Sequence, residues 1–280
     1  METNDYQKDH YIFDQLRKYA KDFAEVYRSE KEKRKELEAT NQQLVKYAED
    51  LNKTLIELKT VHQYLQQAYL DTIHRLVLAA EYRDEGTGSH IVRISRYSAL
   101  IAERFGLPAD DVQNIVYAAP MHDVGKIGIP DSILMKPGKL TDEEFEIMKT
   151  HTTIGANILA NSKAKILQVA HQIALSHHEK WNGKGYPQGL SGDKIPLVGR
   201  IVSLADVFDA LTSRRPYKEP YPVEVALEII KKERGKQFDP DLVDVFLGNI
   251  DEILKIKKEV DSAKDAPFSL LAYEKRGQVS

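Results

Sequence analysis

Histidine and aspartate side chains recur in a pattern that could hold metal ions. The chain has nine histidines, and two places carry adjacent candidate ligands, His122-Asp123 and His177-His178. Imidazole and carboxylate groups together suit iron, manganese, zinc or nickel. Neighbouring residues on a helix point about 100° apart, so neither pair can chelate one ion tightly by itself. Each pair could instead serve two neighbouring ions, with a carboxylate such as Asp123 bridging them.

Further candidates lie on other segments with a helical pattern: His90, His151 and Asp206. A buried histidine is more often a hydrogen-bonded core residue than a ligand, so spacing alone leaves both interpretations open. Asp209 follows Asp206 by one helical turn and is a candidate for orienting a ligand through a hydrogen bond.

The amino-acid composition excludes several kinds of site and several classes of protein. The 280 residues include no cysteine, which excludes disulfides, thiolate nucleophiles and cysteine-based metal sites. The net charge of −3 argues against a protein held to a nucleic acid polymer by bulk positive charge. The first residues lack the apolar core of a signal peptide, and no apolar stretch reaches the roughly 20 residues of a membrane helix. We therefore expect a cytoplasmic protein with no membrane span.

The first 75 residues predict a coiled coil. They contain no glycine or proline, and leucine recurs every seven residues at Leu37, Leu44, Leu51, Leu58 and Leu65. Such a repeat is typical of a left-handed coiled coil, and residues 13–76 would form a rod roughly 95 Å long. Asn41 at a seam position favours a parallel homodimer, although it could also lie on a loose, solvated stretch.

The rest of the chain is predicted to be helical, which makes the fold class all-α. Helical patterns cover residues 90–105, 109–124, 163–179, 197–213, 223–234 and 241–255. Thr141 and Glu144 form a capping-box pattern that opens a helix to about Leu159. Glycine- and proline-rich loops are expected around residues 180–196 and 213–222, and a polar, flexible tail from residue 258.

Four motifs resemble those of the HD-GYP family of phosphodiesterases. They are the strings HDVGKIGIPD from His122, HHEKWNGKGYP from His177, LADVFDALT from Leu204, and RPYK from Arg215 to Lys218. The resemblance covers roughly residues 70–250. It divides the chain into a coiled-coil dimerisation region at 1–75, a catalytic domain at 76–257 and the tail at 258–280.

The resemblance implies an HD-type helical bundle whose metal cluster hydrolyses cyclic di-GMP to pGpG, with further cleavage to GMP left open. The hypothesis is that a hydroxide between two metals attacks phosphorus. Asp123 would be the bridging ligand and a catalytic residue, and Lys126 would stabilise charge at the scissile phosphate. Substrate contacts would fall on Tyr186, Arg215 and Lys218. The implied metal ligands are His90, His122, Asp123, His151, His177, His178 and Asp206.

Two departures from the family pattern affect these expectations. Gly86 stands where three-metal members carry a glutamate, with Glu85 one place off. A two-metal site is therefore favoured over a three-metal one, with iron or manganese as first choices and zinc or nickel as alternatives. Asn182 replaces the usual aspartate, and we expect it to keep the loop geometry because its amide can still form the turn.

Two other functions stay open at this stage. One is an HD-type phosphohydrolase acting on another nucleotide, because HD folds host several such activities. The other is a non-catalytic cyclic di-GMP sensor or scaffold that signals through the coiled coil. An upstream sensory protein or a diguanylate cyclase is the partner that we expect to supply the input signal.

Overall fold

A computed structural model describes residues 3–81, 83, 88–214 and 219–263 of the chain. The chain divides into two compact units, Met1–Ala68 and Tyr69–Ser280. The all-α prediction is confirmed, since the described residues form helices and no strand. Within the same described part of the chain, no helix combines the length and apolar character needed to cross a bilayer.

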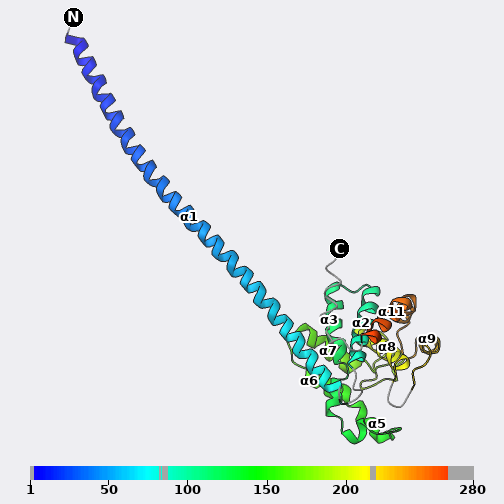
Figure 1. Ribbon diagram of the computed structural model, residues 1–280. Coiled ribbons are helices and arrows are strands. Elements are labelled where there is room, and N and C mark those ends of the chain that lie inside the picture. The colour runs from blue at the N-terminus through cyan, green and yellow to red at the C-terminus, as the bar shows by residue number, and fades with distance from the viewer. Residues whose placement is uncertain (1–2, 82, 84–87, 215–218, 264–280) are drawn as a thin grey trace. The chain divides into compact units, whose positions relative to one another are not determined.

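The predicted rod is helical throughout its described length. Helix α1 runs from Thr3 to Glu81 without a break, as its lack of glycine and proline favours (Figure 1). In the first unit its apolar side chains are exposed, among them the heptad residues Leu44, Leu51 and Leu58. An exposed apolar stripe of this length is the expected surface of a coiled-coil strand.

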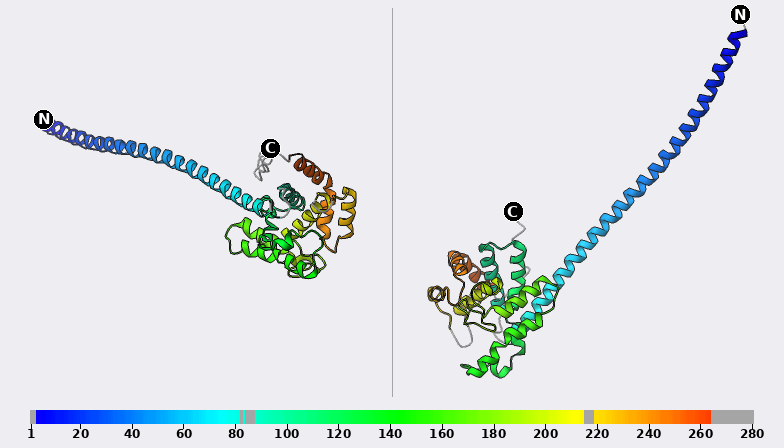
Figure 2. Two further views of the ribbon diagram at one scale, coloured as in Figure 1. Left: turned by 60° about the horizontal axis from the view of Figure 1, so that its bottom comes forward. Right: turned by 180° about the vertical axis from the view of Figure 1, so that it is seen from behind.

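The second unit is a helical bundle (Figures 1 and 2). Its helices are α2 (Ser89–Arg104), α3 (Ala109–Ala118), α4 (Asp131–Leu134), α5 (Asp142–Lys149), α6 (His151–Leu159), α7 (Lys165–Ser176), α8 (Leu197–Thr212), α9 (Val223–Lys232), α10 (Pro240–Gly248) and α11 (Ile250–Ser262). Three 3₁₀ helices join them, η1 (Ala119–Met121), η2 (Val124–Gly128) and η3 (Gly192–Lys194).

The core of the bundle forms around α2 and α8. Tyr97 of α2 and Phe208 of α8 are fully buried with their ring centroids 5.7 Å apart, and Phe208 meets Phe246 of α10 at 5.1 Å. Edge-to-face pairs of this kind add about 1 kcal/mol each to the burial of the rings. Leu70 and Val77 of α1 are also buried in this core, so the compact unit begins before the expected boundary at residue 76.

Three predicted helices are interrupted, and two of the interruptions lie at the candidate site. The segment 109–124 leaves its α-helix at Ala118 because Pro120 cannot donate a backbone hydrogen bond, and η1 follows. The segment 141–159 divides at Thr150 into α5 and α6, although the predicted capping box at Thr141 and Glu144 is present. The segment 241–255 divides at Asn249 into α10 and α11.

Helix α11 also continues beyond its predicted end. It reaches Ser262, where the sequence patterns predicted a flexible tail from residue 258. Val260 explains the extension, because its side chain is buried against the bundle. The expected start of the tail is therefore wrong for residues 258–262.

Gly125 fixes the distance between η2 and α6. A methyl group on its Cα would lie 1.9 Å from the carbonyl oxygen of His151 and 2.4 Å from the backbone nitrogen of Gly155. Both neighbours are main-chain atoms, so a side chain at residue 125 would have to push the two helices apart. Glycine here sets Asp123, just before η2, against His151, the first residue of α6.

We predict that Gly125→Ala lowers the free energy of unfolding by about 3 kcal/mol, because the added methyl overpacks a main-chain contact. Gly248→Ala is the matched control, since no atom lies within 4 Å of its added methyl, and should change stability by less than about 1 kcal/mol. Urea denaturation followed by the fluorescence of Trp181, the single tryptophan, would report on the bundle rather than on the rod. Equal destabilisation by both substitutions would contradict this account of Gly125.

Candidate metal centre

The structure gathers all seven predicted ligands into two neighbouring groups. In each group the candidate ligand atoms lie within 4.8 Å of one another. The first group is Asp123, His151, His177 and His178, and the second is His90, His122 and Asp206. The rings of His122 and His177, one from each group, are 5.2 Å apart between centroids, so the two groups form one centre.

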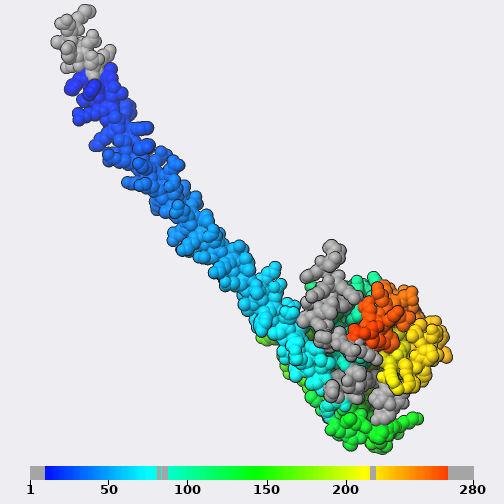
Figure 3. Space-filling model, viewed as in Figure 1, coloured from blue at the N-terminus to red at the C-terminus, as the bar shows by residue number. Residues whose placement is uncertain are grey.

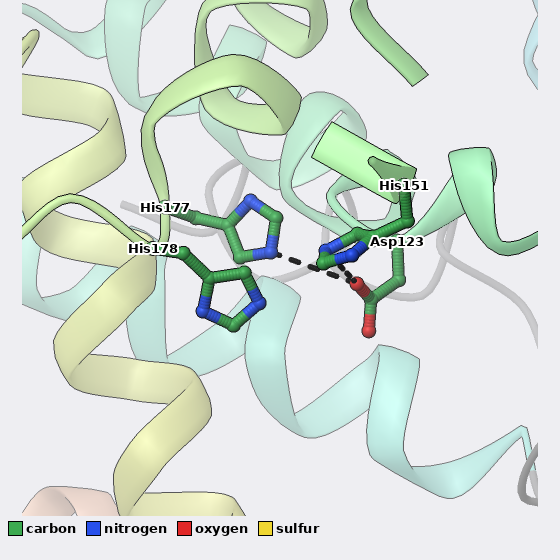
Figure 4. Close-up of side chains that lie close together, drawn as sticks. All are labelled: Asp123, His151, His177 and His178. Atoms are coloured by element: carbon green, nitrogen blue, oxygen red, sulfur yellow. Dashed lines mark ion pairs between the residues drawn. The ribbon is translucent and has the colours of Figure 1, made fainter. Parts of the chain in front are cut away.

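The carboxylate of Asp123 faces both groups, and Figure 4 shows it beside the histidines of the first. Its Oδ1 is 3.3 Å from Nε2 of His151 and 3.6 Å from Nε2 of His177. Its Oδ2 is 3.2 Å from Nε2 of His122 and 2.8 Å from Nζ of Lys126. The two oxygens of one carboxylate therefore face different histidine groups, which is the arrangement a bridging ligand requires.

Charge near Asp123 keeps this carboxylate ionised. Burial by itself would raise the pKa of Asp123, but Lys126 and His122 outweigh it and hold that pKa well below its ordinary value. An ionised carboxylate is the form that coordinates a cation.

Three histidines are oriented by the main chain. Nδ1 lies 3.0 Å from the Ala119 carbonyl in His122, 2.7 Å from the Met148 carbonyl in His151, and 3.0 Å from the Ile173 carbonyl in His177. A carbonyl oxygen can only accept, so Nδ1 carries a proton in each ring, and in the neutral ring Nε2 is then the nitrogen that can bind a metal. His122 and His177 directly follow η1 and α7, and His151 begins α6 just after α5 ends, so each Nδ1 reaches back to a carbonyl of the preceding turn.

His90 is oriented by a side chain. Its Nδ1 lies 2.7 Å from Oδ2 of Asp209, and its Nε2 lies 3.8 Å from Oδ1 of Asp206. Asp209 thus contacts a candidate ligand, as its spacing of one helical turn from Asp206 suggested. His171, by contrast, turns its Nδ1 to the Ala156 carbonyl at 2.8 Å, outside both ligand groups.

The donor atoms at the centre fit divalent transition metals. Nε2 of His151, Nε2 of His177 and Oδ1 of Asp123 are buried and make no hydrogen bond. Leaving such groups buried without a partner costs about 1–3 kcal/mol each, whereas a cation would satisfy them. Burial also lowers the pKa of His151 to about 4 and that of His178 well below its ordinary value. Both imidazoles are therefore neutral near pH 7, the state that binds metal.

Tyr186 lies beside the first ligand group. Its ring stacks on His178, with 4.8 Å between centroids and 27° between planes. Burial raises the pKa of Tyr186 above its ordinary value, so the phenol stays protonated and can donate a hydrogen bond. The other predicted substrate contacts, Arg215 and Lys218, lie outside the described residues, as do Glu85 and Gly86.

The loop that carries Tyr186 is held by a residue that the motifs alone did not single out. Glu179 is buried and accepts hydrogen bonds from the backbone nitrogens of Gln188 at 2.7 Å and Leu190 at 3.0 Å. Its position directly after His177-His178 was the available signal. Asn182 keeps the turn as expected, because its Oδ1 accepts from the backbone nitrogen of Lys184 at 3.0 Å.

Arg93 was also missed. It is almost fully buried in α2, and its guanidinium binds both carboxylate oxygens of Asp209, with Nη2 3.0 Å from Oδ2. No local pattern marks Arg93, because its partner lies 116 residues away in the chain. A charged residue on the apolar face of a predicted helix was the remaining hint.

Known proteins are similar to this chain in sequence, and a solved structure is similar to it in fold. The chain is 47% identical over 197 residues to the cyclic di-GMP phosphodiesterase response regulator RpfG of Xanthomonas campestris, covering 70% of this chain and 52% of that protein. It is 44% identical over 193 residues to the 3'3'-cGAMP-specific phosphodiesterase 2 of Vibrio cholerae, covering 69% of this chain and 37% of that one. The chain thus spans about half the length of these relatives, or less.

A solved structure shows the same fold at lower identity. The cyclic GMP-AMP specific phosphodiesterase V-cGAP3 of Vibrio cholerae superposes with a TM-score of 0.50 and 21% identity, covering 70% of this chain and 54% of that one. The family model described as "HD domain" matches residues 74–242, a span that holds all seven candidate ligands. The expected resemblance is therefore confirmed, and this chain belongs to the HD domain family.

Proposed function

We propose that this chain is a metal-dependent phosphodiesterase that hydrolyses cyclic di-GMP to pGpG. The observation that carries the proposal is the carboxylate of Asp123, whose two oxygens face histidines of two adjacent ligand groups. Relatives named as cyclic di-GMP phosphodiesterases support this choice of substrate.

The donor set is proposed to hold two divalent transition metals, with iron or manganese as first choices and zinc or nickel as alternatives. His151, His177 and His178 would hold one ion, His90, His122 and Asp206 the other, and Asp123 would bridge them. Two bound metals supply Lewis-acid charge and a nucleophilic water at neutral pH.

The remaining side chains would bind and stabilise the substrate. Lys126 brings a positive charge to the bridging carboxylate, with 2.8 Å between Nζ and Oδ2 of Asp123, and it would stabilise charge that develops on the phosphate. Tyr186 offers a flat ring and a hydroxyl at the edge of the ligand groups. From the family motif, Arg215 would bind phosphate in a bidentate manner and Lys218 through a point charge.

A second substrate, 3'3'-cGAMP, is favoured by one finding. A relative that is 44% identical to this chain is named as specific for that dinucleotide. The two dinucleotides share the phosphodiester ring and differ in one base, so the metal centre would act on both and the base contacts would choose between them.

We predict that the full chain, loaded with manganese or, under anaerobic conditions, with iron, converts cyclic di-GMP to pGpG. Liquid chromatography of the reaction products measures this conversion. Asp123→Ala should lower bound metal below two per chain and abolish hydrolysis, because it removes the ligand shared by both groups. Lys126→Ala should keep two metals and slow turnover about 100-fold. Lys139→Ala, at an exposed lysine, is the matched control and should match the unsubstituted chain.

Other outcomes separate the alternatives. Full activity and full metal content in Asp123→Ala would show that the ligand assignment is wrong. Faster turnover of 3'3'-cGAMP than of cyclic di-GMP would assign the second substrate. Metal-loaded protein that binds cyclic di-GMP but releases no product would favour a sensor over an enzyme.

We also propose that the first unit forms a parallel homodimer through its heptad seam. Leu44, Leu51 and Leu58 are each about three-fifths exposed on α1, and Asn41 lies on the same seam. Pairing two copies would bury this stripe, and paired asparagine side chains would set a parallel register. The upstream partner proposed for this chain, a sensory protein or a diguanylate cyclase, would act through this rod.

We predict that Leu58→Glu converts the dimer to a monomer, because it places a charge in the apolar seam. Ile56→Glu is a closely matched control: Ile56 is 59% exposed against 63% for Leu58, but it lies off the seam. Sedimentation velocity should show a dimer for Ile56→Glu and for the unsubstituted chain. Dissociation by both substitutions, or by neither, would contradict the proposed register.

A further inference from the structure

A charged network joins the last described helix to one half of the metal centre. Helix α11 lies at residues 250–262, beyond the span 74–242 that matches the HD domain model, and it forms part of the bundle surface (Figure 3). Oδ1 of Asp261 on this helix accepts a hydrogen bond of 3.0 Å from Nη1 of Arg93. Arg93 binds Asp209, and Asp209 holds Nδ1 of His90. Two side chains therefore separate α11 from a candidate ligand.

Arg93 is the centre of this network. Its side chain is only 6% exposed, so its positive charge depends on the carboxylates around it. Asp209 provides one negative charge at the Nε and Nη2 side, and Asp261 provides a second at Nη1. Neutralising Asp261 would leave the guanidinium with one anionic partner instead of two.

A second connection from the same helix reaches Asp209 by another path. Nζ of Lys257 lies 3.3 Å from Oγ of Ser213 and 3.3 Å from Oδ2 of Asp261. The Ser213 hydroxyl in turn donates to Oδ1 of Asp209 at 3.2 Å. Helix α11 thus holds Asp209 both through Arg93 and through Ser213.

The position of Asp209 matters because it sets the position of His90. A carboxylate that accepts from Nδ1 fixes the proton on that nitrogen and aims Nε2 at the ligand group. If the guanidinium loosens, the Asp209 carboxylate can turn, and the His90 ring loses the partner that orients it. In the first ligand group, Nδ1 of His151 and Nδ1 of His177 instead donate to main-chain carbonyls, which are not part of this network.

We propose that Asp261 and Arg93 are positioning residues, and that α11 tunes the affinity of the group His90, His122 and Asp206 for its metal. This inference rests on the metal centre of the proposed function. By this inference, α11, which lies outside the residues that match the HD domain model, changes the affinity of one metal site and not of the other. A partner or modification that moved α11 would then change the occupancy of one ion and leave the other in place.

The chain offers a matched control for the docking of α11. Nη2 of Arg96 lies 2.6 Å from Oε2 of Glu259, so this ion pair joins the same two helices, α2 and α11. Glu259 and Asp261 are similarly exposed, at 30% and 39% of their side chains. In the described contacts the Arg96–Glu259 pair does not touch Asp209. Glu259→Gln therefore weakens the docking of α11 without removing a charge from the network.

The test compares Mn²⁺ binding to the full chain and to its Asp261→Asn and Glu259→Gln variants, using elemental analysis across a chelator series. Asp261→Asn should weaken the binding of one Mn²⁺ about tenfold and leave the other within twofold. Glu259→Gln should leave both within twofold, and Asp261→Glu should restore much of the loss. Melting temperatures of the metal-free variants, measured in parallel, should fall with both substitutions, and further with Asp261→Asn, because it also removes a partner of the buried Arg93.

Two results would overturn the inference. One is equal weakening by Asp261→Asn and Glu259→Gln, which would assign the effect to the docking of α11. The other is equal weakening of both ions by Asp261→Asn, which would remove the selectivity. Failure of the proposed function is a separate result: a chain that binds two Mn²⁺ but cleaves neither dinucleotide would contradict the phosphodiesterase and leave the binding difference intact.

Discussion

The structure depends on one buried carboxylate, that of Asp123, whose oxygens face the Nε2 atoms of three histidines. Nδ1 of His122, His151 and His177 donates to carbonyl oxygens, and this contact turns Nε2 of each ring toward Asp123. Lys126 and His122 hold the pKa of Asp123 well below its ordinary value, so the carboxylate stays ionised although it is buried. Bound cations would satisfy Nε2 of His151, Nε2 of His177 and Oδ1 of Asp123, which are buried without a hydrogen bond. The packing around Tyr97, Phe208 and Phe246 supports the helices of the bundle that carries these ligands.

The ends of helices orient these histidines through main-chain carbonyls. A histidine just beyond a helix end can donate from Nδ1 to a carbonyl of the preceding turn, as His122, His151 and His177 do. The ends of η1, α5 and α7 therefore each orient a candidate ligand. Gly125 then allows η2 and α6 to approach at main-chain distance. The helix ends orient the histidines, and the close backbone contact at Gly125 brings Asp123 up to His151.

The sequence motifs predicted the class of fold, most helix starts and seven candidate ligands that the structure brings together. His90, Asp206 and the two adjacent pairs could be named because each stands in a short, ordered string. The interruptions at Thr150 and Asn249 could not, because helical periodicity continues across both and only tertiary contacts decide where hydrogen bonding stops. The contact between Arg93 and Asp261 could not be predicted for another reason. The two residues lie 168 positions apart, and no local sequence pattern indicates a contact over that distance.

The candidate ligands differ in whether a substitution can remove the acceptor that orients them. The ligands oriented by carbonyl oxygens have partners that every residue type possesses, so no substitution at Ala119, Met148 or Ile173 deletes the acceptor itself. His90 depends instead on the side chain of Asp209, which any mutation of that codon would replace. His122, which belongs to the same ligand group as His90, thus keeps its orienting acceptor whatever residue stands at position 119. His90 is the ligand whose orientation a single substitution, at Asp209, can remove.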